Sequence, residues 1–296
     1  IYSYIFYKIN TNFLQFFNRL NILRNNILIK KMKELIEKKF FENNITKKKN
    51  LLFFTGHLRT IEHLIKFHKK FMVNNDSDLA ITTWMDDSDS SELIFKVQKI
   101  LKPIYFEIEE FNFNKTTHIF GNLNKFDYVF GKSALSTRSQ VYKMLRTLEI
   151  LKTIENLQNK KYKIVFKSRP DLFFNSKINT NISEEIFFES TIGDWKKDRS
   201  DRFFYASRGE YVRFVNSMKD FGKISWNENS MYPIYDKIPL QEQFIKYCCE
   251  KGNFKSNLFF PITKVWRPER EPKFKDIIKI FFKRFYKYLV YIKKKN

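Results

Sequence analysis

The sequence predicts an α/β fold with a mostly parallel central sheet, and three features indicate it. The apolar run 51–55 passes into a turn at Gly56 and then into a helix-spaced segment from Ile61, which gives a strand, a glycine turn and a helix. An apolar stripe over 139–158 predicts a long helix that leads directly into another short apolar run at 162–168. Further short apolar runs alternate with helix-spaced segments along the chain, as in α/β proteins.

The remaining elements have local signals of their own. Thr60 stands where a helix N-cap is expected, directly before the apolar positions of the first helix. Pro239 suits the first turn of a later helix, because its fixed φ angle and missing N–H are tolerated there. Besides the elements above, we expect strands over 78–84, 103–108, 186–188, 201–206 and 258–261, and helices over 61–72, 92–101, 208–218 and 239–250.

The strand at 162–168 ends in the segment Lys167-Ser168-Arg169-Pro170-Asp171. Pro170 cannot donate to a strand ladder, so pairing should weaken there. Open α/β sheets bind ligands beyond the carboxyl ends of their strands. We therefore expect Asp171 at a strand end, inside the main pocket and near Arg59, which follows another predicted strand. The alternative is a surface turn that carries an Arg–Asp ion pair.

The positive charge of the chain is concentrated at its two ends. The net charge is +23 over 296 residues. Residues 1–49 and residues 273–296 each carry +8, which leaves +7 for the 223 residues between them. A nucleic-acid enzyme is expected to line its working groove with basic residues, so this placement argues against a nucleic-acid partner. We divide the chain into a basic aromatic helical extension (1–49), a catalytic domain (50–272) and an amphipathic basic tail (273–296).

Cysteine usage and hydropathy indicate the cellular compartment of the protein. The two cysteines, Cys248 and Cys249, are adjacent and form no disulfide framework, so the chain fits a reducing compartment. No run of 18 or more apolar residues predicts a membrane span, and no signal peptide is evident. We expect a cytoplasmic protein.

A set of polar residues at predicted strand exits and helix starts suits a diphosphate ligand. Phosphate oxygens bind Arg, Lys and helix N-termini, and glycine lets the backbone approach them. Mg²⁺ or Mn²⁺ takes one or two carboxylates and keeps its other sites for water and phosphate. The acidic pair that includes Asp86 could read a ribose, or it could be a solvated loop. The set comprises Gly56, Arg59, Asp86, Lys143, Arg169, Asp171, Asp201 and Glu242.

Other catalytic chemistries lack their motifs. The sequence holds no HExxH, no CxxC pair and no GxSxG. Pro170-Asp171 could begin a PD-(D/E)xK nuclease motif, but no Glu-x-Lys follows it soon afterwards. His63 and His68 are five residues apart, a spacing that fits zinc poorly.

Several short blocks resemble, in order and spacing, a family of bacterial surface-polysaccharide glycosyltransferases, the WavE-like lipopolysaccharide and capsule synthesis group. The resemblance covers roughly residues 50–250. It implies a GT-A-type fold and sugar transfer from a nucleotide-sugar to a cell-surface glycan or a lipid-linked acceptor. The blocks are LLFFTGHLRT, DLAITTW, STRSQVYKMLRTLEILK, YKIVFKSRPDLFF, SDRFFYAS and PLQEQFIKY.

The resemblance also implies roles for single residues. The segment that ends in Asp171 matches the strand end where GT-A enzymes carry a metal-binding Asp-x-Asp, which makes Asp171 a catalytic and metal-binding candidate for Mg²⁺ or Mn²⁺. Arg169 stands where the first of those aspartates would be, so it could itself neutralise the diphosphate. Asp201 and Glu242 match later blocks, and Glu242 is the second catalytic candidate.

Two other functions stay open at this stage. One is a nucleic-acid-binding protein or nuclease, and the other is a non-catalytic protein held at a membrane surface by its basic ends. In the tail, aromatic and aliphatic residues recur at helical spacing beside a stripe of lysines. Such a helix can lie in the interface of an anionic bilayer, or its apolar side can pack on the domain. We expect the membrane, with the protein peripheral on its inner face.

Overall fold

The computed structural model describes residues 46–85, 90–111, 132–174, 177–182, 184–190, 199–219, 240–259, 263–266 and 270–295. They belong to one compact unit, residues 46–296. A second unit, residues 1–45, lies outside the described residues, and with it the expected N-terminal helix.

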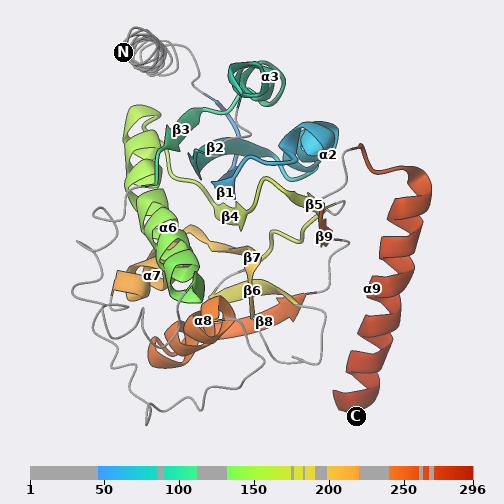
Figure 1. Ribbon diagram of the computed structural model, residues 1–296. Helices are drawn as coiled ribbons and strands as arrows, with labels where there is room; N and C mark the ends of the chain where they lie inside the picture. Colours follow the sequence, from blue (N-terminus) through green and yellow to red (C-terminus); the bar gives the residue numbers. More distant parts are fainter. Residues whose placement is uncertain are drawn as a thin grey trace, which may run out of the picture. The chain divides into compact units, whose positions relative to one another are not determined.

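A seven-stranded sheet forms the centre of this unit (Figure 1). On one side of β7 the strands β1 to β4 pair in parallel, and on its other side β6 and β8 pair in parallel. Among the described strands of this sheet, only β7 is antiparallel to its neighbours. The expected α/β fold with a mostly parallel sheet is therefore confirmed. In spatial order the strands are β3 (Tyr105–Glu109), β2 (Ser77–Trp84), β1 (Asn50–His57), β4 (Ile164–Ser168), β7 (Arg199–Ser207), β6 (Glu185–Ser190) and β8 (Lys255–Phe259).

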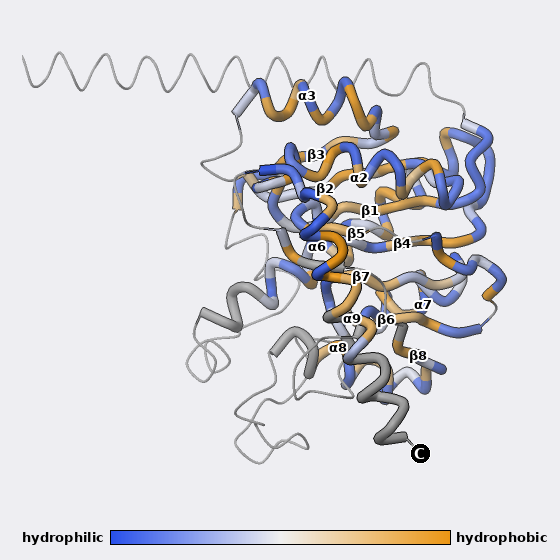
Figure 2. Tube along the Cα trace, turned by 90° about the vertical axis from the view of Figure 1, so that its right-hand side faces the viewer, coloured by the Kyte–Doolittle hydropathy of each residue, from blue (hydrophilic) through white to orange (hydrophobic). Residues whose placement is uncertain are grey.

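The central strands are buried on both faces. Successive side chains of a strand point to opposite faces, and in β1 they belong alternately to two separate apolar clusters. Leu51 and Phe53 lie in one cluster, and Leu52 and Phe54 lie in the other. Such strands read as continuous apolar runs, and Figure 2 shows them as the hydrophobic stretches of the chain.

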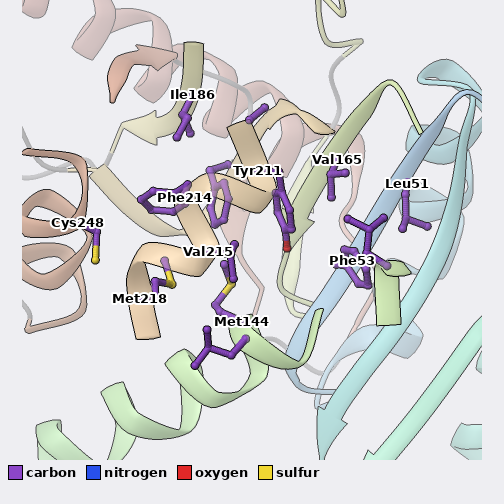
Figure 3. Packing of buried hydrophobic residues seen from close by; sticks show 14 of the residues in the cluster. Leu51, Phe53, Met144, Val165, Ile186, Tyr211, Phe214, Val215, Met218 and Cys248 are labelled. Carbon is purple, nitrogen blue, oxygen red and sulfur yellow. The ribbon is translucent and has the colours of Figure 1, made fainter. Parts of the chain in front are cut away.

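Helices cover both faces of the sheet. Three of the described helices supply the cluster that contains Phe53, and two more supply the cluster that contains Phe54. Figure 3 shows Phe53 of β1 facing Tyr211 of α7, and the two rings stack with their centroids 6.2 Å apart. The first group is α6 (Lys132–Leu157), α7 (Arg208–Ser217) and α8 (Leu240–Lys251), and the second is α2 (Ile61–Asn74) and α3 (Ser91–Leu101).

The expected N-cap at Thr60 is confirmed, but its side chain is used elsewhere. Thr60 does occupy the N-cap position of α2, but its hydroxyl makes no capping hydrogen bond. It donates instead to the main-chain carbonyl of Trp266, at 2.6 Å. Ser90 and Ser207, by contrast, cap α3 and α7 by accepting from main-chain N–H groups. The hydroxyl of Thr60 therefore makes a contact with a residue distant in the chain and not a capping hydrogen bond with its own helix.

A small second sheet, absent from the sequence prediction, fixes the loop after β4. It pairs β5 (Leu172–Phe174) with β9 (Thr263–Val265) in antiparallel fashion. β4 ends at Ser168, as the proline predicts, and the main-chain N–H of Trp266 donates to the carbonyl of Asp171 at 2.8 Å. Burial lowers the pKa of His68 to about 4, so its neutral ring donates from Nε2 to the carbonyl of Pro170 at 2.8 Å.

Candidate functional site

The exits of β1 and β4 lie side by side at the carboxyl edge of the parallel strands. Phe54 of β1 pairs with Ser168 of β4, so the loops that follow them are neighbours. Gly56 has a φ of +116°, a conformation that side chains other than glycine rarely adopt, and Arg59 has a φ of +39°. A non-glycine residue in this region stores strain of about 1–3 kcal/mol, which the surrounding contacts must hold.

Asp171 lies between two arginines, as expected for a strand end near Arg59. Its carboxylate accepts from Arg169 Nε at 2.9 Å and Nη2 at 2.8 Å, and Arg59 Nη1 lies 3.8 Å away. The Asp171 side chain is 1% exposed. Burial by itself would lower the pKa of Arg169, but its hydrogen bonds to Asp171 outweigh burial and raise that pKa. The three side chains therefore form a tightly held charge cluster.

Lys167, which the sequence reasoning did not select, is the buried cation of this edge. Its ammonium donates to the main-chain carbonyl of Asp201, and the residue is 3% exposed. Burial lowers the pKa of Lys167 to about 8, and the nearby Asp201 charge offsets part of that effect. The alternation of β4 does place Lys167 on the same face as Val165, but its burial depends on helices from distant parts of the chain.

A pocket opens where Lys167 meets α6, β7 and α8. It encloses about 320 Å³ of space between atoms, part of it open to solvent. Lys167 and Asp201 are its charged lining residues, and Gln140 adds an amide. The other lining residues are Thr137, Val141, Met144, Phe204, Met218, Phe244 and Ile245. The pocket thus combines an apolar wall with a cation and a carboxylate at one end.

Asp171 is not among the residues that line this pocket. Its side chain contacts Arg169 and Arg59, while Lys167 and Asp201 line the pocket. Arg59 keeps 35% of its side chain exposed at the same edge. Of the predicted residues, the structure therefore brings together Gly56, Arg59, Arg169, Asp171 and Asp201.

Lys143 belongs to a different network. It lies in α6, 2.8 Å from Glu109 and 3.2 Å from the hydroxyl of Thr82, and its ammonium lies 4.1 Å from the centre of the Trp84 ring. Burial lowers the pKa of Lys143, and the hydrogen bond that Lys143 donates to Glu109 acts against that shift. Lys143 thus fixes α6 to the ends of β2 and β3 and does not line the pocket.

Two other predicted residues fall outside the description. Asp86 lies outside the described residues. Glu242 lies in α8, two positions before the pocket residue Phe244, but its side chain is likewise outside the description. The structure does add Glu189, a buried carboxylate that pairs with Arg202 at 3.1 Å beside Asp201.

The described carboxylates do not fit a divalent cation. Asp171, the expected ligand, already accepts two hydrogen bonds from Arg169 and lies almost fully buried. Across the described residues, no three His, Cys, Asp or Glu side chains gather in a way that could hold a metal ion. Cations, and not carboxylates, therefore dominate the described edge near the pocket.

Comparison with known proteins gives loose structural likenesses. No protein-family model and no curated protein matches the sequence. A glycosyltransferase involved in the glycosylation of the major capsid of PBCV-1 overlaps 71% of this chain and 81% of its own, at 8% identity and a TM-score of 0.36. The PaToxG glycosyltransferase overlaps 77% of this chain and 79% of its own, at 10% identity and a TM-score of 0.37. The chemistry of the site rests on its own residues.

Proposed function

We propose that this protein is a glycosyltransferase that moves a sugar from a nucleotide-sugar to an acceptor hydroxyl. Lys167 carries the proposal, since a lysine that is buried and faces a pocket is costly unless an anion compensates it. Its place at the carboxyl edge of parallel strands is where α/β folds bind nucleotides. A phosphate of the donor is the anion that fits this cation.

The pocket suggests how such a donor is held. The phosphates lie against Lys167 and the exposed part of Arg59, and the sugar lies on the apolar wall that Met144 and Phe204 contribute. When the bond between the sugar and the phosphate oxygen breaks, the negative charge that develops on the leaving group is stabilised by the fixed cations. The bound phosphate also keeps Lys167 protonated, because it supplies the charge partner that burial withholds.

The class of acceptor is proposed from the sequence. The blocks that resemble WavE-like enzymes support a cell-surface glycan or a lipid-linked precursor, and the absence of a disulfide framework supports a cytoplasmic protein at the inner face of a bacterial membrane. No step is assigned to Mg²⁺ or Mn²⁺, because Asp171 is engaged by Arg169.

A thermal-shift panel tests the proposal. Nucleoside diphosphates and nucleotide-sugars are added, with and without Mn²⁺, to the wild type, Lys167→Met and Lys163→Met. Lys163 is the matched control, because it is exposed and precedes the same strand. A ligand at 100 times its Kd should stabilise the wild type and the control by about 2.7 kcal/mol, and Lys167→Met much less.

Other results would overturn the proposal. If no nucleotide stabilises the wild type, or if Lys167→Met responds as the wild type does, the pocket is not a donor site. Salt-sensitive binding of DNA without any nucleotide response would favour the nucleic-acid alternative.

A further inference from the structure

The last helix, α9 (Phe274–Lys295), is fixed to the domain by its first turns (Figure 1). Ile277 and Ile280 pack in a small apolar cluster with Leu64 of α2, Phe173 of β5 and Trp266. At the start of the helix, Arg270 pairs with Asp276 at 2.7 Å. The packing alternative raised by the sequence is therefore correct for one face of the helix.

A second apolar face of α9 points to solvent. Phe274 is 77% exposed, Phe282 63% and Phe285 49%, and Ile278, Phe281 and Tyr286 are also exposed. At about 100° per residue, Phe274, Ile278, Phe281 and Phe285 fall within one sector of roughly 60°. That sector lies roughly 100° around the helix from Ile277 and Ile280. We call these six exposed residues the outer face of α9.

Charge decides which partner suits the outer face. Lys275 and Lys279 are exposed on α9, and residues 273–296 carry a net charge of +8. Residues 1–49 also carry +8, so the N-terminal extension and a second copy of the tail are both repelled. Aromatic side chains beside lysines suit the interface of an anionic bilayer, where rings enter the headgroup region and ammonium groups meet lipid phosphates.

The properties of α9 suit a helix that lies on a membrane surface. No helix among the described residues is long and apolar enough to cross one. We propose that the outer face of α9 docks the protein on an anionic lipid surface, with Ile277 and Ile280 keeping the other face on the domain. This inference deepens the proposed function by naming the surface that brings a lipid-linked acceptor within reach, and its test does not depend on the reaction.

Vesicle co-sedimentation of the full chain tests the docking. The vesicles contain phosphatidylcholine alone or phosphatidylcholine mixed with phosphatidylglycerol. The variants are Phe282→Ser/Phe285→Ser and Lys275→Glu/Lys279→Glu. The matched controls are Phe95→Ser, which removes a 63% exposed ring from α3, and Lys69→Glu/Lys70→Glu, which makes the same charge change on α2.

We expect the wild type and both controls to bind the anionic vesicles and both α9 variants to bind at least about tenfold more weakly. Donor hydrolysis without vesicles should be equal in all five proteins. If the α9 variants bind as the wild type does, or if nothing binds, the docking is wrong. Dimerisation that Phe282→Ser/Phe285→Ser abolishes would also overturn it, as would equal binding to DNA and to vesicles. If no protein hydrolyses a donor but the vesicle results hold, only the proposed function fails.

Discussion

Two lysines near opposite ends of β4, the partly buried Lys160 and the buried Lys167, are compensated very differently. Before the strand, Lys160 donates to the Asp78 carboxylate at 3.3 Å and to the carbonyls of Thr46 and Lys48 at 3.0 and 3.1 Å. Within the strand, near its end, Lys167 donates to one main-chain carbonyl, and no described carboxylate forms an ion pair with it. Lys160 therefore stabilises the fold, whereas the ammonium of Lys167 can still donate hydrogen bonds to an anion.

The neighbours of the two lysines differ in the same way. Asp78, beside Lys160, also accepts from the hydroxyls of Tyr162 and Thr46, so the network is closed by groups of the chain itself. Lys167 lines a pocket instead. A buried charge that has no counter-charge in the fold lowers the stability of the protein. Such charges are found at functional sites, where a ligand supplies the counter-charge.

The largest expected difference between the two ends is in turnover. Lys167→Met should lower the initial rate of donor hydrolysis by about 100-fold or more, because a cation that stabilises the leaving group is lost. Lys160→Met should change the rate per folded molecule by less than about threefold, because Lys160 has no contact with the pocket. Equal losses in the two variants would remove the distinction.

Asp171→Asn tests how much the charge cluster near Lys167 contributes to stability. The sequence alone indicates that this variant loses transfer and keeps its fold. The structure leads to a different expectation, because the partly buried Arg169 would lose its charge partner, at a cost of about 3 kcal/mol in the free energy of unfolding. Guanidinium denaturation measures it.

Asp76→Asn is the control for Asp171→Asn. Asp76 is a half-exposed carboxylate that pairs with Lys48 at 3.1 Å, and its φ of +44° suits asparagine. It should lose less than about 1 kcal/mol. A loss for Asp171→Asn as small as for this control would show that the charge cluster is not a stabilising unit.

Alkaline pH should separate the wild type from Lys167→Met. The pKa of Lys167 is about 8 in the folded protein against 10.5 as its ordinary value, so the unfolded chain holds more protons between these values. The free energy of unfolding of the wild type should therefore rise relative to the variant by about 3 kcal/mol from pH 8 to pH 10.5. Nucleotide binding should weaken over the same range as Lys167 loses its proton. Parallel stability curves for the two proteins would place the pKa of Lys167 near its ordinary value.

The smallest expected effect concerns Lys160. Lys160→Met removes a donor from the buried Asp78 but leaves the hydroxyls of Tyr162 and Thr46 in place. The free energy of unfolding should fall by about 1–2 kcal/mol at neutral pH. Under the same conditions Lys167→Met should unfold at the same or a higher denaturant concentration, because it removes an uncompensated charge. The opposite order of stabilities would contradict the roles assigned to the two lysines.

Periodicity predicted most of the fold because long elements repeat their pattern. The strands that begin near Leu51 and Ile164 were expected at nearly their observed bounds. The helix that feeds the second of them was expected to end at nearly its observed end, but it begins at Lys132, seven residues before the expected start. β5 and β9 escaped prediction because three-residue strands have no measurable period. The direction of β7 is set by pairing across the sheet, which no local pattern records.

The site was predictable only in part, for a related physical reason. Asp171 and Arg59 could be placed together because both follow parallel strands that pair. Lys143 was selected for its position near a helix start, but its partner Glu109 is 34 residues away in the chain. Lys167 was passed over because its burial depends on α6 and α8, which approach the strand from distant parts of the sequence.

Trp266 joins the loops of the site to the outer parts of the fold. Its N–H holds the loop after β4, its carbonyl holds Thr60 in the loop after β1, and its ring packs with Ile280 of α9. A shift of α9 at a lipid surface would therefore reach both loops through this one residue, whose ring contacts the helix and whose main chain contacts the loops. In thermodynamic terms the two binding events are then reciprocal: whatever factor the membrane applies to the affinity for the donor, the donor applies to the affinity for the membrane.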